Sequence, residues 1–267
     1  MRFGQWLAMG IALFLACSSL SWATISEGEA VNRAGQQRML SQRMAKNWSL
    51  LAQKAFVSVQ QTQMEQAMQR FDDNLKELRA YDQVHGQQAQ VSLVALTEQW
   101  QIYQAFLRSS PMPQKQKDLL VLAEKILQRA ETVVQQLTAQ HQSSNVLSKT
   151  IAVSGRQRML SQRIVLLYAA RDQKNDPQTY QQAISAFSQA LVDLKKNPKN
   201  TPEIRKRLQD VEVRWNFAQH IFSQPKPLLR VLEANCELLL KEMDEITSMY
   251  AGLSASAKSM ATSAKTA

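Results

Sequence analysis

Two stretches of the chain carry the same set of polar residues. Gly35–Arg43 reads GQQRMLSQR and returns 120 residues later as Gly155–Arg163, GRQRMLSQR, with eight of nine positions identical. Packing tolerates exchange among apolar residues, so it does not explain why Arg, Ser and Gln are repeated letter for letter. The chemistry that these residues offer is anion recognition. Arg presents a planar fork of donors to an oxyanion, and Gly lets a second backbone or a ligand come close.

Both stretches are predicted to be helical, because Gln, Arg, Met and Leu are good helix formers. At 100° per residue, Leu40 and Met44 fall on an apolar side, and Gly35, Arg38 and Gln42 fall opposite. The second copy divides in the same way, with Leu160 and Ile164 on one side and Gly155, Arg158 and Gln162 on the other. The polar side is either a solvated surface or a contact surface. If it is a contact surface, the candidate ligand-binding residues are Gly35, Arg38, Gln42, Gly155, Arg158 and Gln162.

Signals for catalysis are missing from the sequence. His85, His141 and His220 lie in different segments, without Cys or His at the spacing of metal ligands. No Gly-rich phosphate loop or nucleophile elbow occurs. We therefore expect no enzymatic activity, no cofactor and no metal.

The first 23 residues are typical of a secretory signal peptide. Arg2 supplies the positive start, Trp6–Ala16 is a short apolar run, and Ser21-Trp22-Ala23 forms a small-x-small cleavage site. Cys17 leaves a lipoprotein as the alternative. Since no later segment is long and apolar enough for a membrane helix, we expect an exported, periplasmic protein.

Charge and cysteine content restrict the partners and the source of stability. The formal charge of +10 falls to +9 once Arg2 is removed, which favours anionic partners. Nucleic acid is a poor fit to an exported chain without interleaved basic and aromatic residues. Removal of the signal leaves Cys236 as the remaining thiol, so no internal disulfide can form and Cys236 is expected in the core.

The rest of the chain is predicted to form eight helices, at about 26–58, 62–84, 88–109, 114–142, 145–172, 177–196, 202–222 and 226–252. Every Pro falls between periodic segments. Trp100 recurs as Trp215 and Phe71 as Phe187, so four helices are repeated and each Trp is expected in a core. The predicted fold class is all-α, with two tandem antiparallel four-helix bundles.

The junction between the repeats allows two arrangements. No Pro occurs between Gln114 and Asp172, which favours one long shared helix and bundles stacked end to end. A break at Ser143-Ser144-Asn145 is the alternative. The expected domains are 24–143 and 144–267, with a frayed tail from Ser254.

The run Asn32–Lys46, NRAGQQRMLSQRMAK, strongly resembles the start of the PilJ-type sensory domain. That domain is the periplasmic N-terminal part of type IV pilus methyl-accepting chemotaxis transducers, and it is related to the nitrate/nitrite-sensing domain of NarX-like kinases. The resemblance implies four-helix bundles that often form parallel dimers. It also implies signal transduction with a membrane-bound chemotaxis or two-component receptor. In the nitrate sensors, a motif Gly and the Arg three residues later contact the anion from both protomers, which corresponds to Gly35 with Arg38 and Gly155 with Arg158.

This chain departs from the nitrate sensors at Leu40–Arg43, where they carry Gln-Ser-Tyr-Arg, so the anion is not specified. Two hypotheses follow from the sequence. The first is a ligand-sensing protein that binds a small anion and works with a membrane receptor. The second is a helical adaptor whose motif face binds a partner protein without a small ligand.

End-to-end stacking has a consequence for the anion site. It would separate Arg38 from Arg158 by about 35 Å along the helices. One chain could not then close both residues on one anion. A homodimer would be required, with each Arg meeting its symmetry mate.

Overall fold

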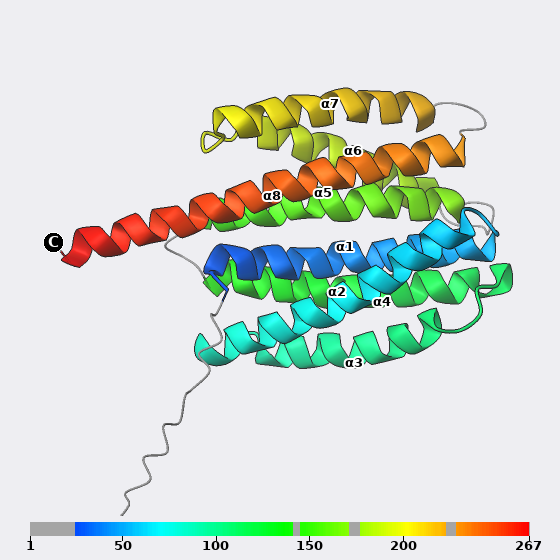
Figure 1. Cartoon of the computed structure of the whole chain (residues 1–267), viewed down its shortest axis with the longest axis horizontal. Coiled ribbons are helices and arrows are strands. Elements are labelled where there is room, and N and C mark those ends of the chain that lie inside the picture. Colours follow the sequence, from blue (N-terminus) through cyan, green and yellow to red (C-terminus); the bar gives the residue numbers. More distant parts are fainter. Residues whose placement is uncertain (1–24, 141–144, 171–176, 223–227, 267) are drawn as a thin grey trace, which may run out of the picture.

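A computed structural model describes residues 25–140, 145–170, 177–222 and 228–266. The described residues form helices and no strand, which confirms the all-α fold class (Figure 1). The α-helices are α1 (Glu27–Ala52), α2 (Val57–Val84), α3 (Gln90–Leu107), α4 (Gln116–Gln140), α5 (Asn145–Ala169), α6 (Pro177–Lys195), α7 (Pro202–Phe222) and α8 (Leu229–Thr266), with a 3-10 turn at Pro113–Lys115.

The helices begin where the sequence supplies caps. The Ser26 hydroxyl accepts a hydrogen bond from the backbone N–H of Glu29, and the Glu29 carboxylate accepts one from the N–H of Ser26, each at 3.3 Å. Thr201 caps α7 in the same manner, accepting from the N–H of Ile204 at 3.2 Å just before the proline at the helix start. The local sequence therefore supplies the caps at these two helix starts.

Each half of the chain packs around an aromatic pair. In α1–α4, Phe71 stacks on Trp100 with ring centroids 4.3 Å apart, and in α5–α8, Phe187 stacks on Trp215 at 4.0 Å. All four rings are buried. The predicted placement of both Trp residues in cores is confirmed, and the two stacks mark equivalent positions in the two repeats.

The expected end-to-end stacking is wrong. Helix α4 ends at Gln140 and α5 begins at Asn145, and the two run in opposite directions (Figure 1). The break that the sequence offered as an alternative is therefore present, although residues 141–144 lie outside the described part of the chain. The four-helix groups lie side by side, with α1 against α5 as the most extensive helix contact.

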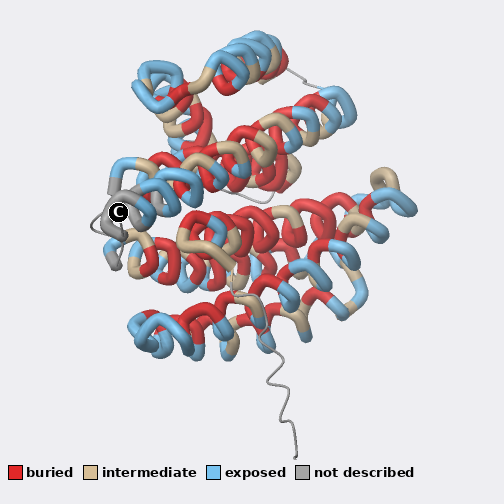
Figure 2. The backbone as a smooth tube through the Cα atoms, turned by 60° about the vertical axis from the view of Figure 1, so that its left-hand side comes forward, coloured by how far each residue is buried: buried red, intermediate tan, exposed pale blue. Residues whose placement is uncertain are grey.

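Burial explains this arrangement. Helix α1 is covered nearly all round, including small residues such as Ala30, Ala34 and Ala45 (Figure 2). Stacking end to end would have left the outer sides of α1 and α5 in water. Side-by-side packing removes both sides from solvent at once, and burial of apolar surface is the main favourable term in folding.

The expected fraying of the tail is also wrong for the described residues. Helix α8 continues to Thr266 and extends past the other helices (Figure 1). Ser254 is buried, and its Cβ would lie 3.0 Å from a Cβ added to Gly28. The first turn of α1 therefore packs against α8 beyond residue 252, where the sequence predicted that this helix would end. None of the described helices meets the length and hydropathy needed to cross a bilayer, and residues 1–24, including Cys17, lie outside the description.

Candidate functional site

The two motif helices, α1 and α5, lie side by side and run in the same direction (Figure 1). Gly35 and Gly155 face each other where they meet. A Cβ added to Gly35 would lie 3.9 Å from the Cα of Gly155, and one added to Gly155 would lie 3.8 Å from the Cα of Gly35. The missing side chains therefore let the helices approach closely, as the polar-side argument anticipated for a contact surface.

Arg38 and Arg158 meet at this glycine pair. Their Nη2 atoms lie 3.5 and 3.2 Å from the Cβ position of Gly35, and 3.4 and 3.1 Å from that of Gly155. Both side chains are buried, at 1% and 0% exposure. The helix register thus brings together four of the six predicted ligand-binding residues, and the four come from both repeats.

Each guanidinium is held by one contact inside its own repeat and one across the interface. Arg38 pairs with Glu131 of α4 at 2.7 Å and donates from Nη2 to the backbone carbonyl of Ala152 at 2.8 Å. Arg158 pairs with Asp244 of α8 and donates from Nη2 to the carbonyl of Asn32 at 3.3 Å. The two sets of contacts are related by an approximate two-fold exchange of the repeats.

The two guanidiniums are buried close together, and each is paired with a carboxylate of its own repeat. Burial lowers the pKa of both arginines, while the neighbouring Glu131 and Asp244 raise it; the charge of Arg38 further lowers the pKa of Arg158. The Nε atoms of both side chains are buried without a hydrogen-bond partner among the described residues. Two like charges in a low-dielectric environment repel strongly, and the carboxylates of Glu131 and Asp244 offset this repulsion.

Gln42 and Gln162 lie one turn beyond the arginine pair and do not join it. Gln42 donates to the carbonyl of Ala123 at 3.1 Å and accepts from Arg163 at 3.1 Å. Gln162 donates to Ser161 at 3.4 Å and hydrogen-bonds to Glu237, while its side-chain oxygen has no partner among the described residues. Both Gln side chains therefore contact the α4 or α8 side of the interface.

Ion pairs that cross between the repeats flank the site. Arg43 of α1 binds Glu237 of α8 at 2.7 Å, and its equivalent Arg163 of α5 binds Glu124 of α4 at 2.8 Å. The last Arg of each motif therefore joins the two halves of the chain.

Other repeated letters have structural roles. Gln37 donates to the carbonyl of Phe71 at 3.0 Å, and Gln157 donates to that of Phe187 at 2.8 Å. Both Gln side chains are fully buried, and each amide nitrogen finds its acceptor on the next helix of the same repeat. The repeated Gln therefore links the motif helix to the following helix in each half.

Comparison with known protein families gives two matches along the chain. The model of the PilJ family, described as the type IV pili methyl-accepting chemotaxis transducer N-terminal region, matches residues 20–148 and again residues 139–235. The chain belongs to the PilJ family. It carries tandem PilJ copies, as the duplicated motif predicted, and is related to the sensory domains of chemotaxis transducers. No curated protein and no solved structure matches significantly.

Two expectations for the PilJ motif are corrected by the geometry. Arg38 and Arg158 were expected about 35 Å apart and turned away from their bundles toward a second chain. They are instead adjacent and buried between the two PilJ copies of one chain, because α1 and α5 pack against each other. The burial predicted for Leu40, Met44, Leu160 and Ile164 is confirmed.

The carboxylates that hold the PilJ arginines were missed by sequence reasoning. Glu131 and Asp244 lie 113 residues apart, as do Glu124 and Glu237 in the same two helices. In each helix the two acids are separated by seven residues, which places them on one face. This repeated pair of acids could have been recognised in the sequence. It is not found by searching at the 120-residue offset of the PilJ motifs, because its own offset is 113 residues.

The two PilJ copies differ at one buried charge. Lys46 is 0% exposed and binds Glu233 at 3.1 Å and Glu237 at 2.6 Å. The equivalent of Lys46 in the second copy is Leu166. Cys236, beside this cluster, is buried as predicted, and burial raises the pKa of its thiol to about 12. The described residues contain no cluster of His, Cys, Asp or Glu that could hold a metal ion.

Proposed function

We propose that this protein is a sensor of a small oxyanion, with Arg38 and Arg158 of one chain closing on a single anion between the two PilJ copies. The observation that carries the proposal is the pair of buried guanidiniums at the Gly35–Gly155 contact, each with an Nε that has no hydrogen-bond partner in the part of the chain that the structure describes. In the resembling nitrate sensors, two protomers each contribute an Arg. Here, two repeats of one chain take the place of the protomers, and nitrate or a similar planar oxyanion is the first candidate.

Binding would proceed by exchange of acceptors. The anion would accept hydrogen bonds from both arginines in place of the Ala152 and Asn32 carbonyls, which now receive the Nη2 donors across the interface. Since each of these bonds links α1 to α5, replacing them would alter how the two repeats hold each other. A change of that kind is what a sensory domain needs in order to report a ligand.

The wider function that we propose follows the family. The protein would be exported to the periplasm through the signal peptide at 1–23 and would work with a membrane-bound chemotaxis or two-component receptor. The proposed site does not need a homodimer, because the Gly–Arg surface is already covered by the other repeat. A homodimer would have to form through another surface. The same holds for the adaptor hypothesis, whose partner was expected on the motif face.

Calorimetric titration with nitrate, nitrite and related oxyanions tests the proposal. We expect one anion per chain and a melting temperature that rises with ligand concentration. Arg38→Lys and Arg158→Lys keep the charge but remove the planar fork. Each single variant should abolish the one site, since both side chains are needed.

Arg205→Lys, on α7 away from the motif helices, serves as the matched control and should bind as the parent does. Two anions per chain, or loss of half of the binding in each single variant, would contradict the shared site. The absence of any stabilising oxyanion would leave a protein partner as the remaining explanation.

A further inference from the structure

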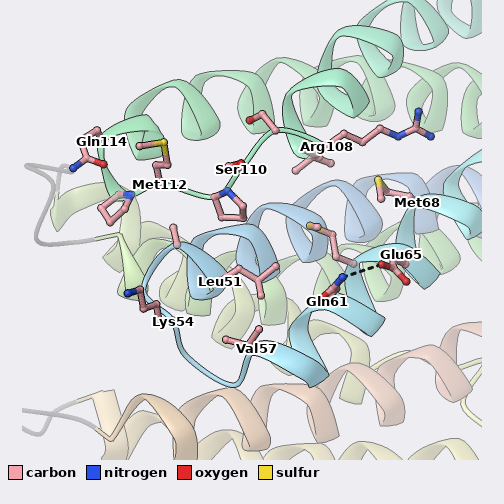
Figure 3. Close-up of a pocket in the computed structure, with 16 residues that line it drawn as sticks. Leu51, Lys54, Val57, Gln61, Glu65, Met68, Arg108, Ser110, Met112 and Gln114 are labelled. Atoms are coloured by element: carbon pink, nitrogen blue, oxygen red, sulfur yellow. Dashed lines mark hydrogen bonds between the residues drawn. The ribbon is translucent and has the colours of Figure 1, made fainter.

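A pocket of about 720 Å³ opens at the end of the first repeat, between the α1–α2 and α3–α4 connections (Figure 3). The proposed anion site does not use it. The side chains that line most of its wall are apolar, and they include Leu51, Val57, Met64, Met68, Leu107, Met112 and two prolines, Pro111 and Pro113. Its volume lies within the range of small-molecule sites, which are mostly apolar with a few polar groups at defined places.

Three methionines give this pocket an adaptable lining. Met64 is buried, Met68 is partly buried, and Met112 is 45% exposed at the mouth. Methionine is unbranched and polarisable, so it can adjust to an alkyl or aryl group of irregular shape.

The charges around the pocket favour a negatively charged head group. Lys54 and Arg108 both belong to the lining, and within the described chain neither has a carboxylate partner. Glu65, the acid of the lining, accepts a hydrogen bond from Gln61 at 3.4 Å. Figure 3 shows Lys54 and Arg108 on opposite sides of the group, with Leu51 and Val57 nearer to Lys54.

The connection that forms one wall has a strained backbone. Lys54 and Phe56 both adopt left-handed conformations, with φ of 56° and 53°. Residues with a Cβ disfavour this region, and such strain is often retained where a ligand is held. Gln53 of this connection also donates to the Ala169 carbonyl at 3.0 Å, so the wall contacts the second repeat.

The second repeat carries aromatic rings at two positions equivalent to lining residues of the pocket. Tyr180 precedes the stacked Phe187 by seven residues, as Met64 precedes Phe71, and Phe222 follows Trp215 by seven, as Leu107 follows Trp100. The rings of Tyr180 and Phe222 are in contact, with centroids 6.0 Å apart. The first repeat therefore has non-aromatic side chains, Met64 and Leu107, at the two positions where the second repeat has these rings.

We propose that the methionine-lined pocket binds a small amphipathic carboxylic acid, with its apolar chain among the methionines and its carboxylate at Lys54 or Arg108. The site is independent of the anion site, because Leu51 lies 13 residues along α1 from Arg38, about 20 Å. The exposed Met112 places the mouth of this pocket at the protein surface. A ligand can therefore enter it without opening the interface between the repeats.

Octanoate, below its micellar concentration, is the probe. Calorimetry and thermal unfolding on the full exported chain should show one octanoate per chain and a higher melting temperature. 1-Octanol, which lacks the carboxylate, should bind at least tenfold more weakly. The double variant Met64→Tyr/Leu107→Phe introduces the residues of the second repeat and should remove octanoate binding. Val94→Tyr adds the same ring at an exposed position outside the pocket and should leave binding unchanged.

Met112→Glu keeps the test decisive if the double variant does not fold. This substitution is at an exposed position and places a negative charge at the mouth, so octanoate affinity should fall at least tenfold. The proposal is overturned if octanoate gives no heat and no thermal shift with the parent chain. It is also overturned if binding persists in a folded Met64→Tyr/Leu107→Phe variant or is unchanged in Met112→Glu.

Discussion

The interface between the two repeats and the outer end of the first repeat differ in how closely the two copies match each other. At the interface, Gly35 and Arg38 face Gly155 and Arg158 with equivalent contacts in both halves. At the outer end, Met64 stands where the second repeat has Tyr180. A shared site at an interface of repeats needs matching residues from both copies. A pocket within one repeat has no such requirement, so each copy can fill or open it separately.

The largest effects should come from positions that are equivalent in the two cores. Phe71→Ala and Phe187→Ala each remove a fully buried ring that stacks on a Trp, and we expect each to lower the free energy of unfolding by about 3–5 kcal/mol. Urea denaturation followed by circular dichroism measures both. Costs that differed by more than about 2 kcal/mol would show that the two cores are less equivalent than their aromatic stacks indicate.

Lys46 makes the interface between the repeats asymmetric, because the second repeat has Leu166 at the equivalent position. Lys46→Leu leaves Glu233 and Glu237 without their buried cation and should cost about 3 kcal/mol or more. Lys46→Leu/Glu233→Leu places at each position the residue that the other repeat has there, Leu166 for Lys46 and Leu120 for Glu233, and should recover most of that loss. The readout is again the free energy of unfolding. If the double variant were no more stable than the single one, the charge cluster would be needed for more than pairing.

Helix positions and core residues could be predicted from the sequence because they depend on local signals. The prolines at 177 and 202 and the recurrence of Trp100 as Trp215 gave the helix starts and cores closely. The relative placement of the bundles could not be predicted, because it depends on the opposite directions of α4 and α5, and the sequence between these helices carries no Pro or Gly to signal a change of direction. Helical periodicity placed Arg38 on the side away from Leu40, but periodicity does not say what covers that side.

Leu substitutions at two helical glycines distinguish the cost of steric crowding at the interface from the gain in helix propensity. Gly35→Leu would push a branched side chain against the Arg158 guanidinium, whose Nη2 lies 3.2 Å from the Cβ position. Overpacking of this kind costs about 1–3 kcal/mol. Gly252→Leu is the matched control, because nothing lies within 4 Å of its Cβ position and the substitution should gain up to about 1 kcal/mol of helix propensity. Equal thermal stability of the two variants would argue against close packing of α1 on α5.

The smallest expected effect is a pH dependence from Glu237. Burial alone would raise the pKa of this carboxyl, but Lys46 and Arg43 outweigh burial and the pKa lies below its usual value of 4.5. Its ionised form is therefore favoured by folding, and the stabilisation is present above pH 4.5 and lost as the pH falls through the folded pKa. One carboxyl can contribute a slope of at most about 1.4 kcal/mol per pH unit.

Unfolding measured between pH 6 and pH 3 should show a shallower loss of stability in Glu237→Gln than in the parent. Glu124→Gln, the equivalent change in the first repeat, should alter the slope less, because Glu124 is 44% exposed and its pair with Arg163 is screened by water. Glu237 is 21% exposed and holds both Lys46 and Arg43. The contrast between the two variants therefore measures how far the charge cluster has made the two sides of one interface unequal. Identical slopes would place the acid sensitivity elsewhere in the chain.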